Sequence, residues 1–315
     1  MNHKDAISNN IKIVSIGTYI PEDRYPNLSK AEKFGYDESF LRDKVGFMNL
    51  SRKRKNESMI DLCHNAFKDL NNKMDINLEE IQLITVVTQN PLYKIPHTSA
   101  ILHNILGVSK NCMTFDISQG CAGYCHALEI VKSLMESLNL TNSLIFTCDC
   151  YSEIVNENNK NVSMIFGDGA TATFLSREGN GYIVKDSIFG TLPESYDCLV
   201  CQDSLEMDGG KVFSYASKEV PESIDVLLQR NRVNREDIDV FILHQGSKFI
   251  VNYLRTKLNV LEEKAGFSSS DFGNTVSSSI PIQLSNFFND KVKQNIVLSG
   301  FGVGFTWGNC LLEYS

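Results

Sequence analysis

The sequence predicts an α/β protein with a central sheet. Apolar or β-branched runs recur along the chain, and amphipathic stretches separate several of them. The chain has 315 residues and 42% of them are hydrophobic, which is enough for a substantial core in a layered fold. The predicted strands are residues 11–16, 81–88, 113–117, 143–147, 170–175, 240–243 and 296–299.

Charge and composition disfavour several classes of protein. The net charge of −8 argues against nucleic-acid binding, which needs a broad basic face. No stretch approaches the roughly 20 apolar residues of a membrane-spanning helix, and the polar start lacks the apolar run of a signal peptide. The nine cysteines form no regular framework, which is typical of a reducing compartment. We therefore expect a cytoplasmic protein that does not insert into a membrane.

Two local clusters invite a binding role but have a structural alternative. The cysteine pairs 148/150 and 198/201 are spaced closely enough to suggest zinc, yet turn glycines do not flank them. We interpret them as buried or incidental thiols and expect no metal. The basic run 52–55 fits either a solvated loop or a site for a phosphate or an acidic partner.

Cys121 lies at the switch from the strand 113–117 to an amphipathic helix. Free N–H groups and the helix dipole favour a thiolate there, so we expect a thiol pKa below the usual value of about 8.5. The small neighbours Gly120, Ala122 and Gly123 leave room for an acyl group. A buried structural cysteine is the alternative. In the helix, Ala127, Ile130, Val131, Leu134 and Met135 are expected to form one buried stripe.

The chain divides near residue 177 into two α/β halves, 1–176 and 177–315. Residues 186–210 show little periodicity and read as a long irregular connection. Each half contains a strand that leads into a candidate catalytic turn, at Cys121 and at His244, which suggests a duplicated architecture.

Three features of the second half could contribute to a site. His244 follows the strand 240–243 and precedes a helix, a position where α/β proteins bind ligands; a core histidine is the alternative. Asn274 follows Gly273 in a turn and is either functional or a turn residue. The glycine-rich segment 296–308 reads as a strand, a turn and a strand, which allows close backbone approach to a ligand.

Cys, His and Asn in this order support two chemistries. In a papain-like hydrolase, His acts as the base and Asn orients it. In a condensing enzyme, Cys accepts an acyl group from a thioester, while a neutral His and the Asn donate hydrogen bonds to an enolate oxygen.

Taken together, the segments resemble the β-ketoacyl-acyl-carrier-protein synthase III family of the thiolase superfamily, nearly from end to end. The motifs that carry the resemblance are Cys121-Ala-Gly, Phe166-Gly-Asp-Gly-Ala170, Met207-x-Gly209 with Val212-Phe213, His244-Gln245, Gly273-Asn274-Thr275 and Gly302-x-Gly-Phe-Thr-Trp-Gly308.

The resemblance implies a five-layered αβαβα fold of two similar halves and a homodimer. It makes Cys121 the acyl-accepting nucleophile, with its own N–H and that of Val303 as the oxyanion hole. It also implies that His244 and Asn274 stabilise the decarboxylated malonyl thioester. No cofactor is implied; the substrates would be an acyl-coenzyme A or acyl carrier protein donor and malonyl on a carrier protein or on coenzyme A, in fatty acid biosynthesis or a related pathway.

Further positions match substrate-binding residues of the family. Met207, Gly209 and Phe213 match the pantetheine channel, and Ile95 matches the residue that closes the acyl pocket of the partner subunit. Phe40 and Lys160 stand where typical members sandwich adenine between Trp and Arg, and Lys44 and Lys248 complete the expected substrate-binding set.

Several departures from the family pattern indicate a specialised member with an unusual acyl donor. Lys lacks the planar face of Arg, so the Phe40/Lys160 pair stacks less well on adenine. Phe249 replaces the Arg that serves carrier docking, Gly246-Ser247 replaces Ala-Asn, and Val303 replaces Gly. The alternatives are an acyltransferase of the same fold that does not condense, a papain-like hydrolase, and a non-catalytic subunit; the retained residues favour condensation.

Overall fold

A nine-stranded sheet runs through the computed structural model, which describes residues 10–288 and 293–315. Its first part consists of β1 (Lys12–Tyr19), β7 (Ala170–Ser176), β6 (Asn142–Cys148), β4 (Ile81–Val87) and β5 (Met113–Ile117), in this spatial order. Its second part consists of β11 (Val240–Leu243), β12 (Asn295–Gly302), β13 (Thr306–Tyr314) and β8 (Tyr182–Thr191). Only a short antiparallel pairing of β1 with β8, at residues 12–13 and 182–183, joins the two parts.

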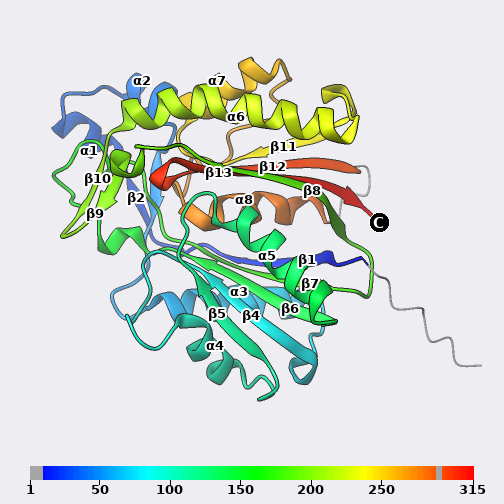
Figure 1. Ribbon diagram of the computed structural model, residues 1–315. Coiled ribbons are helices and arrows are strands. Elements are labelled where there is room, and N and C mark those ends of the chain that lie inside the picture. Colours follow the sequence, from blue (N-terminus) through cyan, green and yellow to red (C-terminus); the bar gives the residue numbers. More distant parts are fainter. Residues whose placement is uncertain (1–9, 289–292) are drawn as a thin grey trace, which may run out of the picture.

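Helices cover both parts and fill the space between them (Figure 1). α6 (Gly209–Asn231) and α7 (Lys248–Leu258) lie outside the second part, and α3 (Met59–Lys73) and α4 (Thr98–Leu106) lie outside the first. α5 (Gly123–Ser137) and α8 (Ser279–Leu284) form the middle layer. The order helix, sheet, helix, sheet, helix confirms the predicted five-layered fold.

Three apolar cores match the three helical layers. The central core packs α5 and α8 between both parts of the sheet, with Leu83 and Leu298 contributed from opposite sides. One outer core lies under α6 and α7, and the other lies between α3, α4 and the first part of the sheet. Each half therefore buries both faces of its strands, which explains why the strands read as continuous apolar runs.

Smaller elements gather at one end of the molecule (Figure 1). They are β2 (Arg24–Pro26), α1 (Leu28–Lys33), α2 (Glu38–Phe40), the π-helical turn Leu41–Val45, β3 (Asn49–Ser51), β9 (Leu199–Cys201) and β10 (Leu205–Met207). Short 3-10 turns link other elements, at Leu78–Glu80, Tyr151–Glu153, Tyr196–Cys198, Arg235–Asp237, Val276–Ser278, Ser285–Phe287 and Val303–Phe305.

The predicted strands are all present, but two local predictions were wrong. Ile130 is 39% exposed and lies off the buried face of α5, because Ala127, Val131 and Met135 already fill the contact with the sheets. Residues 186–210 are not an irregular connection: they contain the end of β8, the β9–β10 hairpin and the start of α6. The division at 176/177 falls between β7 and β8, and as a domain boundary it stays a prediction.

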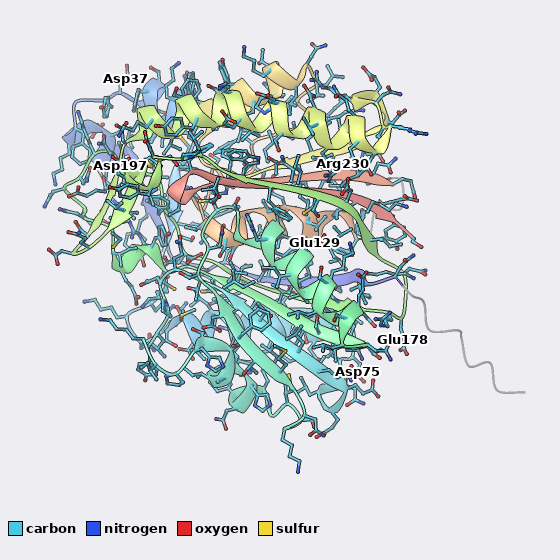
Figure 2. The ribbon with its side chains drawn as sticks, viewed as in Figure 1. Asp37, Asp75, Glu129, Glu178, Asp197 and Arg230 are labelled. Atoms are coloured by element: carbon cyan, nitrogen blue, oxygen red, sulfur yellow. The ribbon has the colours of Figure 1, made fainter. Side chains whose placement is uncertain are left out.

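Polar contacts explain why β8 escaped sequence analysis. Arg230 of α6 binds Asp186 at 2.6 Å, and the Ser187 hydroxyl donates to Glu129 of α5 at 3.0 Å. Arg230 and Glu129 are labelled in Figure 2, on the two helices that flank the strand. The strand is thus held by these polar groups, by its ladder with β13 and by the buried Tyr182 and Val184 at its start, and its apolar residues form only short stretches.

Within the described ranges, the structure has no helix that is both long and apolar enough to cross a bilayer.

Gly17 provides a test of the packing between β1 and α3. A Cβ at this position would lie 2.1 Å from the carbonyl oxygen of Ala66 and 2.3 Å from the amide nitrogen of Leu70, both backbone atoms of α3. We expect Gly17→Ala to lower the free energy of unfolding by about 1–3 kcal/mol, the usual cost of overpacking. Chemical unfolding would measure this, with Ser15→Ala on the same strand as a control expected to stay near the wild-type value. Equal stability of both variants would contradict the close packing.

Candidate active site

Cys121 sits in the turn between β5 and α5, pressed against the backbone of β12. A Cβ at Gly302 would lie 2.9 Å from the Cys121 sulfur, and one at Gly300 would lie 2.7 Å from the Cys121 carbonyl oxygen. The backbone N–H groups of Cys121 itself and of Val303, which follows β12, are near enough to the sulfur to lower the pKa of the thiol. The two N–H groups expected to form an oxyanion hole therefore converge on the thiol, one from each half of the chain.

The expected low pKa of Cys121 was wrong. Burial raises the pKa of this thiol to about 12, and the nearby Asp149 carboxylate adds to the effect. The two N–H groups act in the opposite direction without cancelling the burial. α5 begins at Gly123 with Ala122 as its N-cap, so Cys121 stands before the helix and not within its first turn. The thiol is therefore protonated at physiological pH.

His244 enters the same space from the carboxyl end of β11. Its backbone N–H donates to the Ser299 carbonyl at 2.9 Å, and the residue is 2% exposed. Burial lowers the pKa of the imidazole to about 3, so the ring is neutral at physiological pH. Its Nδ1 lies 2.9 Å from the Ser279 hydroxyl, and the ring packs edge-on against Phe301.

Asn274 completes the constellation, and its amide orientation is fixed. Its Oδ1 accepts the Val276 N–H at 2.8 Å, which leaves Nδ2 facing His244 Nε2 at 3.4 Å. Backbone bonds to Ile165 and Gly167 place the residue. Val276 has a φ of +53°, an unusual conformation for a β-branched residue that costs on the order of 1–3 kcal/mol.

Sequence analysis missed Asp149, a buried acid at the end of β6. It accepts hydrogen bonds from the Gln89 N–H at 2.8 Å, from the Ser277 hydroxyl at 2.5 Å and from the Ser277 N–H at 3.4 Å. Burial raises the pKa of Asp149 to about 6, even though these donors stabilise the charge. The acid ties the ends of β4 and β6 to the segment that carries Asn274. The sequence held one signal for this residue: Asp149 is an acid that directly follows the apolar strand β6.

A cavity of about 370 Å³ lies next to Cys121, His244 and Asn274. Cys121, His244, Asn274 and Val303 are among the residues that line it. The other lining residues are mostly apolar and include the predicted Met207, Gly209 and Phe213, together with Ile165, Phe166, Leu199, Val212, Phe249, Ile250 and Phe301, which sequence analysis did not single out for this role. A long, mostly uncharged substrate arm suits such a channel.

Comparisons with known proteins agree along almost the whole chain. The family profile for 3-Oxoacyl-[acyl-carrier-protein (ACP)] synthase III matches residues 115–192, and the profile of its C-terminal part matches residues 228–314. A β-ketoacyl-[acyl-carrier-protein] synthase III of Campylobacter fetus is 30% identical over 322 residues, which cover 96% of this chain and 98% of the relative. Its counterpart in Clostridium perfringens is 30% identical over 327 residues, covering 96% and 99%.

Solved structures show the same architecture. The crystal structure of 3-oxoacyl-[acyl-carrier-protein] synthase III from Aquifex aeolicus superimposes with a TM-score of 0.90 at 27% identity, covering 96% of this chain and all of that one (100%).

The chain belongs to the 3-oxoacyl-[acyl-carrier-protein] synthase III family. As a member of the synthase III family it is a condensing acyltransferase, and the resemblance inferred from its motifs is confirmed.

Other residues predicted from the synthase III pattern do not line the cavity. One face of Phe40 is covered by Tyr36, with ring centroids 4.1 Å apart and nearly parallel planes. Lys160 is exposed on a loop, Lys248 is half-buried, and Ile95 is 87% exposed. The Lys44 Nζ lies 4.4 Å from the ring centroid of Phe249, which lines the cavity.

Lys44 therefore places a cation beside Phe249. The positive charge comes from the π-helical turn and not from α7. A cation above an aromatic face is stabilised by the ring's quadrupole. The positive charge of Lys44 consequently lies next to the wall of the cavity that Phe249 forms.

Two clusters noted in the sequence remain, the basic run 52–55 and the close cysteine pairs. Arg52 binds Glu157 at 2.8 Å, Lys53 binds Glu153 at 2.7 Å, and Arg54 pairs with Glu22. The Cys148 and Cys150 sulfurs are 3.9 Å apart and buried. All nine cysteines fall in the described ranges and are free, and those ranges contain no cluster of three or more metal-binding side chains.

The protonation of Cys121 can be tested by alkylation. Because burial raises the pKa of this thiol to about 12, labelling by iodoacetamide should still accelerate between pH 8 and pH 10, with no plateau. Intact-mass analysis would follow the reaction, and Cys121→Ser would identify the labelling of other thiols. A plateau below pH 8 would show that the thiol is already ionised in the resting enzyme.

Proposed function

We propose that this enzyme transfers an acyl group to Cys121 and joins it, by decarboxylative Claisen condensation, to a malonyl thioester. The observation that carries the proposal is the convergence of two side-chain nitrogens, His244 Nε2 and Asn274 Nδ2, 3.4 Å apart in the cavity that also contains Cys121. Two donors aimed at one point suit an oxygen that becomes negatively charged during the reaction.

The first half-reaction makes a thioester on Cys121. The sulfur attacks the carbonyl carbon of the donor thioester, and the N–H groups of Cys121 and Val303 bind the resulting oxyanion. Collapse of this intermediate breaks the bond to the donor sulfur, and the proton of Cys121 leaves with the donor thiol. The close approach of Gly302 leaves no side chain between the sulfur and this hole.

The second half-reaction forms the carbon–carbon bond. The malonyl carboxylate leaves as carbon dioxide, and its electron pair forms an enolate whose oxygen accepts hydrogen bonds from His244 and Asn274. The enolate carbon attacks the acyl carbonyl on Cys121, and the carbon–sulfur bond breaks to give a β-ketoacyl thioester. Overall, acyl thioester, malonyl thioester and one proton become β-ketoacyl thioester, carbon dioxide and a free thiol.

The geometry disfavours a papain-like hydrolase. In that mechanism Asn orients the imidazole from the nitrogen that does not face the thiol. Here Asn274 lies at Nε2, and the other nitrogen meets Ser279. The retained His and Asn pair likewise argues against an acyltransferase that does not condense.

The substrates arrive through the apolar cavity, whose volume of about 370 Å³ and mostly apolar lining suit a pantetheine arm. Tyr36 covers one face of Phe40, which leaves a single face for an adenine and supports a carrier protein as the acyl donor. Lys44 and Lys248 provide cations for the acidic surface of such a carrier. The chemistry requires no further cofactor, and nine free cysteines fit a cytoplasmic enzyme.

Two exposed features support a homodimer. β5 is the last strand of the sheet and offers an open edge, and Met113 at its start is 45% exposed. Ile95 is 87% exposed, unusual for an aliphatic residue unless something covers it. In a dimer paired along β5, Ile95 would close the acyl pocket of the other subunit.

Removing either donor tests the condensation. We expect His244→Ala or Asn274→Ala to lower carbon dioxide release from malonyl thioester by about 10²–10³-fold, the usual loss for one oxyanion donor. Intact-mass analysis should still detect acyl-Cys121 in both variants, while Cys121→Ser should show none. Absence of carbon dioxide release by the wild type with malonyl on either carrier would favour simple acyl transfer.

The homodimer is tested by light scattering after size exclusion. The wild type should have the mass of two chains, and Met113→Glu should shift it towards one chain because a charge would be buried at the paired edge. Leu261→Glu is the matched control, since Leu261 is 66% exposed and follows α7, a helix that packs on α6 and not on β5. A wild type with the mass of one chain would refute the proposal.

A further inference from the structure

We propose that Ser279 is a positioning residue that holds His244 in the tautomer with its proton on Nε2. The inference rests on the proposed condensation, for which His244 must donate a hydrogen bond from Nε2. It assigns a role to a hydroxyl that contacts neither substrate nor Cys121 in the proposed mechanism.

The Ser279 hydroxyl lies between two fixed groups. Its Oγ is 3.1 Å from the backbone nitrogen of Gln245 and 2.9 Å from Nδ1 of His244. Ser279 is the first residue of α8 and is 1% exposed, and His244 is 2% exposed. Bulk water is therefore excluded from both side chains.

The direction of one hydrogen bond is settled by the backbone. The N–H of Gln245 can only donate, so Oγ accepts from it. If Nδ1 carried the ring proton, Oγ would accept hydrogen bonds from both nitrogens. The buried hydroxyl proton would then have no acceptor at either of these two contacts. The arrangement that gives the buried hydroxyl proton an acceptor has the hydroxyl donating to Nδ1. The proton of the neutral ring is then on Nε2.

The position of Gln245 is itself held by buried amides. Its Nε2 donates to the Leu243 carbonyl at 3.0 Å and to Gln283 Oε1 at 3.2 Å, and its Oε1 accepts the Ser268 N–H at 2.8 Å. Gln283, in turn, donates to the Ser279 carbonyl at 3.0 Å. The N–H that sets the direction of the serine hydroxyl therefore cannot easily turn away.

The tautomer decides what the site does with an oxyanion. With the proton on Nε2, the ring and the Asn274 amide are two donors with a separation of 3.4 Å, longer than is usual for a hydrogen bond between them. Both are then free for the enolate oxygen. With the proton on Nδ1, Nε2 becomes an acceptor that engages Asn274 and repels the oxyanion.

The tautomer can be observed directly. In ¹⁵N-labelled wild type, the His244 resonances, assigned by their loss in His244→Gln, should report a protonated Nε2 and an unprotonated Nδ1 at pH 7. In Ser279→Ala the ring should shift towards protonated Nδ1 or a mixture. A wild-type spectrum with the proton on Nδ1 overturns the proposal, whether or not the variant folds.

Activity provides the second measurement. Ser279→Ala should lower carbon dioxide release from malonyl thioester by about tenfold or more, as partial loss of one donor implies. Acylation of Cys121 should stay near the wild-type rate, because its oxyanion hole does not involve His244. The matched control is Ser278→Ala, whose hydroxyl is equally buried but bonds to the carbonyls of Thr147 and Gly169. This variant should change neither the His244 spectrum nor the ratio of the two rates.

The two proposals fail in different ways. A wild type that releases no carbon dioxide refutes the condensation and leaves the tautomer reading standing. Equal loss of both rates in Ser279→Ala, with an unchanged His244 spectrum, assigns Ser279 a purely structural role.

Discussion

The active site depends on the close approach of two backbones, the Cys121 turn and β12. At Gly300 and Gly302 the strand passes so near that a single added Cβ would meet the Cys121 carbonyl or its sulfur. The two parts of the sheet share only a short strand pairing, so this contact and the middle helices bring the halves into register. The thiol comes from one half, and the Val303 N–H, proposed as its second oxyanion donor, comes from the other. Neither half contains a complete site.

Burial determines the protonation states in this site. It keeps Cys121 as a thiol and His244 as a neutral imidazole, and it raises the pKa of Asp149 to about 6, so this acid is still mostly ionised at pH 7. A neutral ring suits a hydrogen-bond donor to an enolate and is a weak base for a thiol with so high a pKa. Transfer of the acyl group must therefore couple loss of the thiol proton to formation of the carbon–sulfur bond. The dry pocket also strengthens each hydrogen bond to a developing oxyanion.

Sequence periodicity found the strands because they are buried on both faces, and motif spacing placed Cys121, His244 and Asn274 in one family pattern. It missed β8, because the polar residues Lys185, Asp186 and Ser187 interrupt the apolar residues of that strand, and side-chain contacts hold Asp186 and Ser187 in place. It also misjudged the Cys121 pKa, since a helix N-terminus is visible in a sequence and complete burial is not. Asp149 and Ser279 escaped notice for a related reason: their roles exist only through partners on distant segments.

The segment from Gly273 to Ser279 concentrates the constraints of the second half. Asn274 supplies a donor, the Val276 N–H orients its amide, and Ser277 anchors the segment to Asp149. Val276 pays for this arrangement with a strained backbone, since φ of +53° crowds a β-branched side chain. Such strain persists only where surrounding contacts over-determine the conformation. The bonds on both sides of Val276 meet that condition, because Asn274 is tied to Ile165 and Gly167, and Ser277 to Asp149. The strained residue thus stands where the orientation of a reacting donor is fixed.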